Sequence, residues 1–216
     1  MSRSAFDPAF ADLPAELGVF PLSGALLLPG GHLPLNIFEP RYLALVQDAL
    51  GAGRMFGLIQ PRSGDDGAPL YPVGCLARIA AFRETPDGRF LVTLAGVARF
   101  RVAEETAGRH GYRRVRADYG DFGADLDAPA EAGVNRSRLL AALKPYLRQQ
   151  DMADEADSLD KAPTHLLLTS VAMLCPFEPR EKQALLEAPS PEARAEMLIT
   201  LLTMGASSFD PNTAEQ

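Results

Sequence analysis

The sequence predicts an α+β protein in which a small barrel-like sheet with one inserted helix precedes a bundle of helices. Apolar and polar residues alternate in short segments up to about residue 120, whereas apolar residues follow a helical period from about residue 130. Charge changes near the same place, because residues 54–120 carry eleven arginines against seven acidic residues, and residues 121–216 carry eight basic against sixteen acidic residues. The expected divisions are a flexible lead-in over residues 1–15, the sheet subdomain over 16–122, the helical subdomain over 123–205 and a flexible tail over 206–216.

Size and composition are those of a globular chain with a proper core: 216 residues, 47% hydrophobic, 23% charged, with a net charge of −7. The two cysteines and three histidines are scattered, so the sequence predicts no disulfide scaffold, no metal site and no cofactor. No apolar run approaches the roughly 20 residues of a membrane helix, and the N-terminus lacks a secretory pattern. We expect a cytoplasmic protein without membrane partners.

The first elements lead to a junction between a strand and a helix. Residues 18–22 and 25–28 are expected as two short strands, followed by a glycine-rich turn. In residues 33–37, Leu33, Leu35 and Ile37 alternate with Pro34 and Asn36, which is typical of a strand with one apolar face.

Pro40 marks the start of the inserted helix, because proline is well tolerated at the first helical position. Residues 42, 45, 46, 49 and 50 then form one apolar helical face, and Gly51 and Gly53 end the helix. Two interpretations of the junction remain open. In the structural one, Glu39 and Arg41 stabilise the helix start; in the functional one, Phe38, Glu39, Arg41 and Tyr42 line a surface that holds a partner.

The next segments are expected to complete the sheet. Residues 55–59, 71–83, 90–94, 97–103 and 112–119 are predicted strands, with a hairpin turn at 85–88 and a break at Gly96. In the fourth of these, Phe100 should point inward and Arg99 and Arg101 outward. Several short strands with tight turns favour a barrel-like sheet.

Four helices are expected in the second half. Leu139, Leu140, Leu143 and Leu147 indicate the first, and an acidic stretch of residues 151–160 follows it. Residues 162–174 are apolar nearly all round, as in a central buried helix. Pro179 should open a short helix, and Ser190 followed by Pro191 should cap the last.

The motifs together resemble the N-terminal domain of Lon proteases. The resemblance is carried by Phe20-Pro21-Leu22, by Leu28-Pro29-Gly30, by the run from Leu33 to Tyr42 that contains Ile37-Phe38-Glu39-Pro40-Arg41-Tyr42, and by Asp87-Gly88-Arg89 and Arg99-Phe100-Arg101. Leu28 and Asn36 depart from the usual Phe and frequent His. The resemblance implies a PUA-like β-barrel, a helical bundle and a role in capturing substrate proteins.

No GxxxxGK[ST] phosphate loop is present, and none of the three lysines is placed as a base beside a serine. We therefore expect a stand-alone, non-enzymatic member of the Lon N-terminal family that lacks the ATPase and protease modules. Its expected partners are unfolded or exposed hydrophobic protein segments, together with a separate ATP-dependent protease. The candidate partner-binding residues are Asn36, Phe38, Glu39, Arg41, Tyr42 and Arg99.

Two alternatives stay open at this point. The arginine-rich middle segment, with Arg99, Arg101, Arg113, Arg114 and Arg116, could form an RNA-binding strip on a PUA-like barrel, although a net charge of −7 weakens counterion release. A peptidase or hydrolase would need a nucleophile with a base, and no GxSxG elbow is present.

Overall fold

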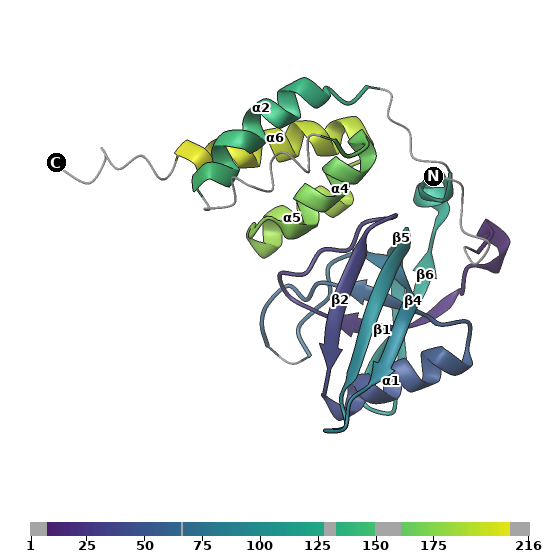
Figure 1. Ribbon diagram of the computed structural model, residues 1–216. Helices are drawn as coiled ribbons and strands as arrows, with labels where there is room; N and C mark the ends of the chain where they lie inside the picture. The colour runs from purple at the N-terminus through teal and green to yellow at the C-terminus, as the bar shows by residue number, and fades with distance from the viewer. Residues whose placement is uncertain (1–7, 66, 128–132, 150–160, 208–216) are drawn as a thin grey trace. The chain divides into compact units, whose positions relative to one another are not determined.

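The computed structural model describes residues 8–65, 67–127, 133–149 and 161–207. The chain divides into two compact units, residues 1–129 and residues 130–216. Figure 1 shows a sheet-based first unit and an all-helical second unit. The acidic stretch at 151–160, most of the expected tail and the first seven residues of the expected lead-in lie outside the described residues.

The first unit is built on a mixed sheet of six strands in the order β2-β5-β4-β3-β1-β6. The strands are β1 (Glu16–Pro21), β2 (His32–Ile37), β3 (Met55–Ile59), β4 (Val73–Glu84), β5 (Phe90–Arg109) and β6 (Tyr112–Asp118). An additional pairing of β5 with β6 closes β1, β3, β4, β5 and β6 into a ring. The α+β fold is confirmed. The sheet is not a regular barrel, because β2 lies outside the ring and pairs only with the first part of β5.

The strand-to-helix junction has the backbone that its sequence predicts. Helix α1 (Pro40–Gly51) begins with Pro40 in its first turn, after an extended Glu39 with φ −70° and ψ 132°. Its buried residues are Tyr42, Leu45, Val46 and Ala49, and this face packs against β1, β3 and β6. The apolar period of the helix is therefore confirmed.

The long strand β5 differs from the sequence prediction, because Gly96 does not break it. Leu76 pairs with Ala98 and Ala77 with Gly96, so Val97 is an extra residue in a β-bulge. A glycine is required at this point, since a Cβ on Gly96 would lie 2.1 Å from the carbonyl oxygen of Leu28. The bulge bends β5 and allows one strand to pair with β2, β4 and β6.

The segment at residues 25–28 is not a strand, contrary to the prediction. Its leucines Leu26, Leu27 and Leu28 are nonetheless buried. The segment lies against Gly96, whose main chain bonds instead to Gly30 and Gly31 at 2.9 Å. Burial of a hydrophobic run here comes from packing over β5 and not from a ladder of hydrogen bonds.

Two short 3₁₀ helices flank the ring. The first, η1 (Phe10–Asp12), lies within the part of the expected lead-in that the structure describes. The second, η2 (Gly120–Leu126), packs on β5 and belongs to the first unit. The sequence places the subdomain boundary after residue 122, whereas the first compact unit extends through residue 129, because η2 returns to the sheet.

The core of the ring forms around Phe100, which has no exposed surface. Cβ atoms added to Gly57 or Gly74 would lie 2.8 and 2.6 Å from the tip of its ring. Val19, Leu76 and Val115 complete the same cluster. Inward burial of Phe100, as its alternation predicts, is confirmed.

The second unit contains α2 (Arg136–Gln149), α4 (Thr164–Leu174), α5 (Pro179–Glu187) and α6 (Pro191–Ser207). Its buried surface includes Leu139 and Leu143 of α2 and Leu198 and Leu202 of α6, two helices that pack on each other. The predicted cap of α6 is confirmed, because the Ala193 amide donates to Ser190 Oγ at 3.2 Å. No helix within the described ranges is long and apolar enough to span a bilayer.

Candidate functional site

The junction after β2 separates its two aromatic residues. Tyr42 is 6% exposed, and its ring meets Phe20 edge-on at 4.1 Å between centroids. Phe38 is 62% exposed, and the guanidinium of Arg89 lies 5.8 Å from its ring centroid. Tyr42 therefore belongs to the core, whereas Phe38 offers an apolar surface to solvent.

Glu39 and Arg41 are partners of each other. Arg41 Nε donates to Glu39 Oε2 at 3.1 Å, and Arg41 Nη2 lies 2.9 Å from the same oxygen. The Arg41 guanidinium also stacks 4.7 Å from the Tyr42 ring centroid. These contacts hold the charged pair against the start of α1, which is the geometry that the structural interpretation requires.

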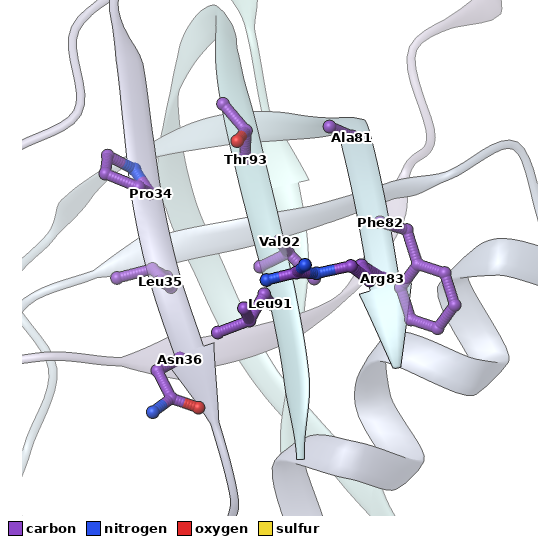
Figure 2. A pocket seen from close by; sticks show the side chains of 9 residues that line it. All are labelled: Pro34, Leu35, Asn36, Ala81, Phe82, Arg83, Leu91, Val92 and Thr93. Carbon is purple, nitrogen blue, oxygen red and sulfur yellow. The ribbon is translucent and has the colours of Figure 1, made fainter. Parts of the chain in front are cut away.

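An open groove of about 500 Å³ crosses the neighbouring strands β2, β5 and β4. Figure 2 shows its nine lining side chains, three from each strand. They are Pro34, Leu35 and Asn36 from β2, Leu91, Val92 and Thr93 from β5, and Ala81, Phe82 and Arg83 from β4.

The register of the sheet places these residues in rows. Asn36 pairs with Leu91, and Leu91 with Arg83 on the other side. In the next row on the same face, Pro34 pairs with Thr93 and Thr93 with Ala81. Side chains alternate across a strand, so this face carries small, apolar and neutral polar groups together with one cation.

Aromatic side chains border the far end of the groove. Phe82 is 37% exposed and meets Phe90 at 4.9 Å between ring centroids. Phe38 follows β2 directly and stacks with Arg89, which precedes β5. Phe38 and Phe82 thus expose apolar surface at this end of the β2–β5–β4 sheet.

Arg99 was expected on the outside of β5, and it lies on the face opposite the inward Phe100, but it is not exposed there. Its side chain is 8% exposed and forms an ion pair with Asp125 of η2 through Nε and Nη2, each at 2.8 Å from a carboxylate oxygen. The Arg99 amide also donates to Asp125 at 2.9 Å, and its guanidinium lies 4.7 Å from the Phe122 ring centroid. Arg99 therefore lies on the outer face, as its alternation with Phe100 predicts, but η2 covers this part of the face, and the residues of β5 alone do not indicate that cover.

The six expected partner-binding residues do not form one site. Asn36 lines the groove, and Phe38 comes directly after the end of β2. Arg41 and Tyr42 instead border a separate cavity of about 190 Å³ beside Arg113, which is engaged by Glu105 and the Ala68 carbonyl. Sequence reasoning missed the residues on β4 and β5, because the row that sets Arg83 opposite Leu91 and Asn36 depends on the register of three strands.

The arginines of the proposed RNA-binding strip are all ion-paired within the first unit. Arg101 pairs with Asp121, Arg113 with Glu105, Arg114 with Glu16, and Arg116 with Glu104, in addition to the pair of Arg99 with Asp125. Each positive charge therefore has a neighbouring carboxylate, which removes the excess potential that a phosphate backbone requires.

A cluster of titratable groups lies where α1 meets the β5–β6 hairpin. Tyr112 Oη donates to Asp48 Oδ2 at 2.7 Å, His110 Nδ1 lies 3.0 Å from the same oxygen, and Arg109 Nε lies 3.3 Å from it. The hydrogen bond from Tyr112, aided by His110 and Arg109, lowers the pKa of Asp48 below 3.8. Desolvation and Asp48 raise the pKa of Tyr112 to about 12, so Tyr112 stays protonated at neutral pH and its hydrogen bond fastens the hairpin to α1.

The cysteines are small buried side chains. Cys75 and Cys175 are 1% and 6% exposed, and neither forms a disulfide. Burial raises the pKa of the Cys175 thiol to about 12, so it stays protonated at neutral pH. This is the opposite of the lowered pKa that activates a nucleophilic cysteine.

The fold is shared with solved N-terminal domains of Lon proteases. The crystal structure of a Lon N-terminal domain protein from Xanthomonas campestris superimposes with a TM-score of 0.61 at 27% identity, covering 86% of this chain and 97% of that one. The N-terminal domain of a Lon protease from the Mycobacterium avium complex gives the same TM-score at 15% identity, which indicates the fold alone, over 90% of this chain and 99% of that one.

The sequence comparisons place the chain in the same family. Residues 16–204 match the family model of the ATP-dependent protease La (LON) substrate-binding domain, and the chain belongs to this family. It is 30% identical over 201 residues to Lon protease 2 of Myxococcus xanthus and 32% identical over 191 residues to Lon protease of Salinispora arenicola. These alignments cover 88% and 86% of this chain but 24% and 23% of the relatives, so the chain spans about a quarter of their length.

Proposed function

We propose that this protein captures other proteins through exposed hydrophobic segments, which bind in the groove over β2, β5 and β4. The observation that carries the proposal is an open groove of about 500 Å³ that Leu91 lines, with the exposed Phe38 directly after β2. Burying apolar surface is favourable and non-directional, so such a groove suits clients of many sequences. The family description as a substrate-binding domain supports the same role.

We also propose that binding is not coupled to chemistry in this part of the protein. The groove lining contains no histidine, cysteine or carboxylate side chain. A general base or a nucleophile with its base would need such groups within hydrogen-bond distance of the substrate. Since the relatives are Lon proteases, an ATP-dependent protease is the partner that we propose for processing the captured client.

Of the residues first proposed from the sequence, Phe38 and Asn36 remain candidates for direct contact with a client. Arg99 is proposed as a positioning residue that holds η2, and Tyr42, Glu39 and Arg41 as supports of the junction, because their contacts are already made inside the first unit. RNA binding is the less favoured function, since the arginines on β5 and β6 are neutralised.

Two exposed phenylalanines of the first unit provide a matched test. Phe38 is 62% exposed beside the groove, and Phe10 is 54% exposed in η1. We expect Phe38→Ser to weaken binding of a short dye-labelled peptide of leucine, serine and glutamine about tenfold, because a buried phenylalanine contributes about 1.5–3 kcal/mol. Fluorescence anisotropy measures the affinity of both variants.

Phe10→Ser is the control and should bind the peptide as the wild type does. Both variants should unfold in urea within about 0.5 kcal/mol of the wild type, because each removes an exposed side chain. Equal affinities of the two variants, or the absence of any peptide binding by the wild type, would contradict the proposal. Retention of RNA by the wild type in preference to the peptide would favour the alternative.

A further inference from the structure

We propose that the groove selects extended segments in which an acidic side chain neighbours an apolar one, and that Arg83 binds the carboxylate. This inference rests on the proposed function and names the chemistry of its clients. It assigns to Arg83 a specificity role that neither its sequence context nor the likeness to Lon domains supplies.

The first observation is the position of Arg83. It pairs across the sheet with Leu91, which pairs in turn with Asn36. Figure 2 shows the Arg83 side chain laid over β5 toward the middle of the groove, whereas the Phe82 ring points to the other side of β4. When one client side chain contacts Leu91, a side chain one or two residues away along the client would therefore lie near the Arg83 guanidinium.

The second observation is that the Arg83 side chain lacks the partner that comparable arginines have. All six arginines on β5 and β6, residues 99, 101, 109, 113, 114 and 116, form ion pairs with carboxylates. Among the residues that the structure describes, the side chain of Arg83 makes no hydrogen bond or ion pair. An arginine presents five donors in a planar fork, and here they are directed over an apolar floor.

The third observation is charge complementarity. The nine lining residues include Arg83 and no acidic residue, in a chain whose net charge is −7. Arg89 adds positive charge at the end of the groove, although it already contacts Asp87 at 3.0 Å and the Phe38 ring. An acidic client would thus be attracted to this face and repelled by the rest of the surface.

The shape of the groove favours an internal segment over a chain end. Its lining comes from three adjacent strands of one sheet, without residues from a loop or helix that would close one side. A polypeptide could therefore cross it and continue in both directions. The expected ligand group is the side-chain carboxylate of Asp or Glu and not a terminal carboxylate.

The test compares three blocked peptides that differ at one position, carrying Glu, Gln or Lys beside the same leucines. We expect the Glu peptide to bind the wild type about threefold to fivefold more tightly than the Gln peptide, the range of a solvent-exposed ion pair. The Lys peptide should bind more weakly than the Gln peptide. Raising the salt concentration should reduce these differences without abolishing binding of the Gln peptide.

Two substitutions identify the residue responsible. Arg83→Gln should bind the Glu and Gln peptides equally, and Arg83→Glu should prefer the Lys peptide. The matched control is Arg54→Gln, which removes the same charge from another exposed position of the first unit that does not line the groove. It should keep the preference of the wild type.

Each result decides one of the two proposals. A glutamate preference that survives Arg83→Gln, or is lost equally in Arg54→Gln, would overturn the role of Arg83 while leaving capture by the groove intact. Equal binding of the three peptides by the wild type would also overturn the role of Arg83 and leave capture by the groove intact. Failure of all three peptides to bind would overturn capture itself, and the inference with it.

Discussion

The two halves of β5 use charge in opposite ways. From Arg101 onward the strand pairs with β6, and every arginine on these two strands meets a carboxylate. Before Gly96 the strand lies between β2 and β4, where its outer face is largely apolar and the Arg83 side chain has no partner among the described residues. The comparison teaches that charge is satisfied internally at one end of the sheet, while the other end carries an arginine without a partner among the described residues.

The largest expected effect concerns the buried ion pair of the second half. Asp125→Ala would leave the guanidinium of Arg99 buried without its partner, at a cost of about 3–5 kcal/mol in the free energy of unfolding. Urea unfolding followed by tyrosine fluorescence measures this, because four of the five tyrosines lie in the first unit. Asp121→Ala, in the exposed pair with Arg101, is the control and should cost less than about 1 kcal/mol. Similar decreases in the free energy of unfolding of both variants would show that the buried ion pair does not contribute more to stability than the exposed one.

A smaller effect is expected where the two halves meet. Gly96→Ala places a methyl group against the carbonyl oxygen of Leu28, so the segment at 25–28 must shift, at a cost of about 1–3 kcal/mol. Gly51→Ala is the control, because nothing lies within 4 Å of its added Cβ at the end of α1. Unchanged urea unfolding of Gly96→Ala would mean that the bulge tolerates a side chain and does not define the bend.

The smallest expected effect is a pH dependence of stability where Asp48 of α1 contacts the β5–β6 hairpin, at the end of the second half of β5. The pKa of Asp48 is lowered in the folded state, so its charge stabilises the fold above the unfolded value of 3.8, and this contribution is lost as pH falls through the folded pKa. Asp48→Asn should be less stable than the wild type at neutral pH by under about 1 kcal/mol. Urea unfolding at neutral pH and near pH 3 should show that the difference in the free energy of unfolding between the wild type and Asp48→Asn is smaller in acid. A difference in unfolding free energy that does not change with pH would show that the charge of the Asp48 carboxylate is not its cause.

Local features of the fold could be predicted well from the sequence. The strand at 55–59, the helix that begins at Pro40 and the cap at Ser190 each depend on neighbouring residues, and the structure has them where their patterns place them. Proline at a helix start and a serine cap are signals that operate within one turn of chain.

Features that depend on packing between distant segments were missed. The bulge at Val97 accompanies the bend by which β5 pairs with both β2 and β6, and Arg99 is buried because η2 covers it. Nothing near these residues in the sequence specifies those partners. The leucines at 26–28 have the composition of a strand but pack as an irregular segment on Gly96.

The candidate site was predicted only in part for the same reason. The helical period places Tyr42 on the apolar face of α1, which the structure buries, whereas no pattern around Phe38 indicates that it is exposed. Arg83 carries no signal of its own, because its neighbours Leu91 and Asn36 come from two other strands. A cross-strand row is a property of register, which the residues of one strand do not reveal.

Pro34 has a consequence for the solubility of a protein that displays apolar surface. In the described sheet β2 is an outer strand, and such strands readily join those of other molecules. Proline carries no amide hydrogen, so a continuous ladder of hydrogen bonds could not form along that border. Copies of this protein should therefore be hindered from pairing edge to edge at β2, which lowers the tendency of the neighbouring apolar face to nucleate aggregates.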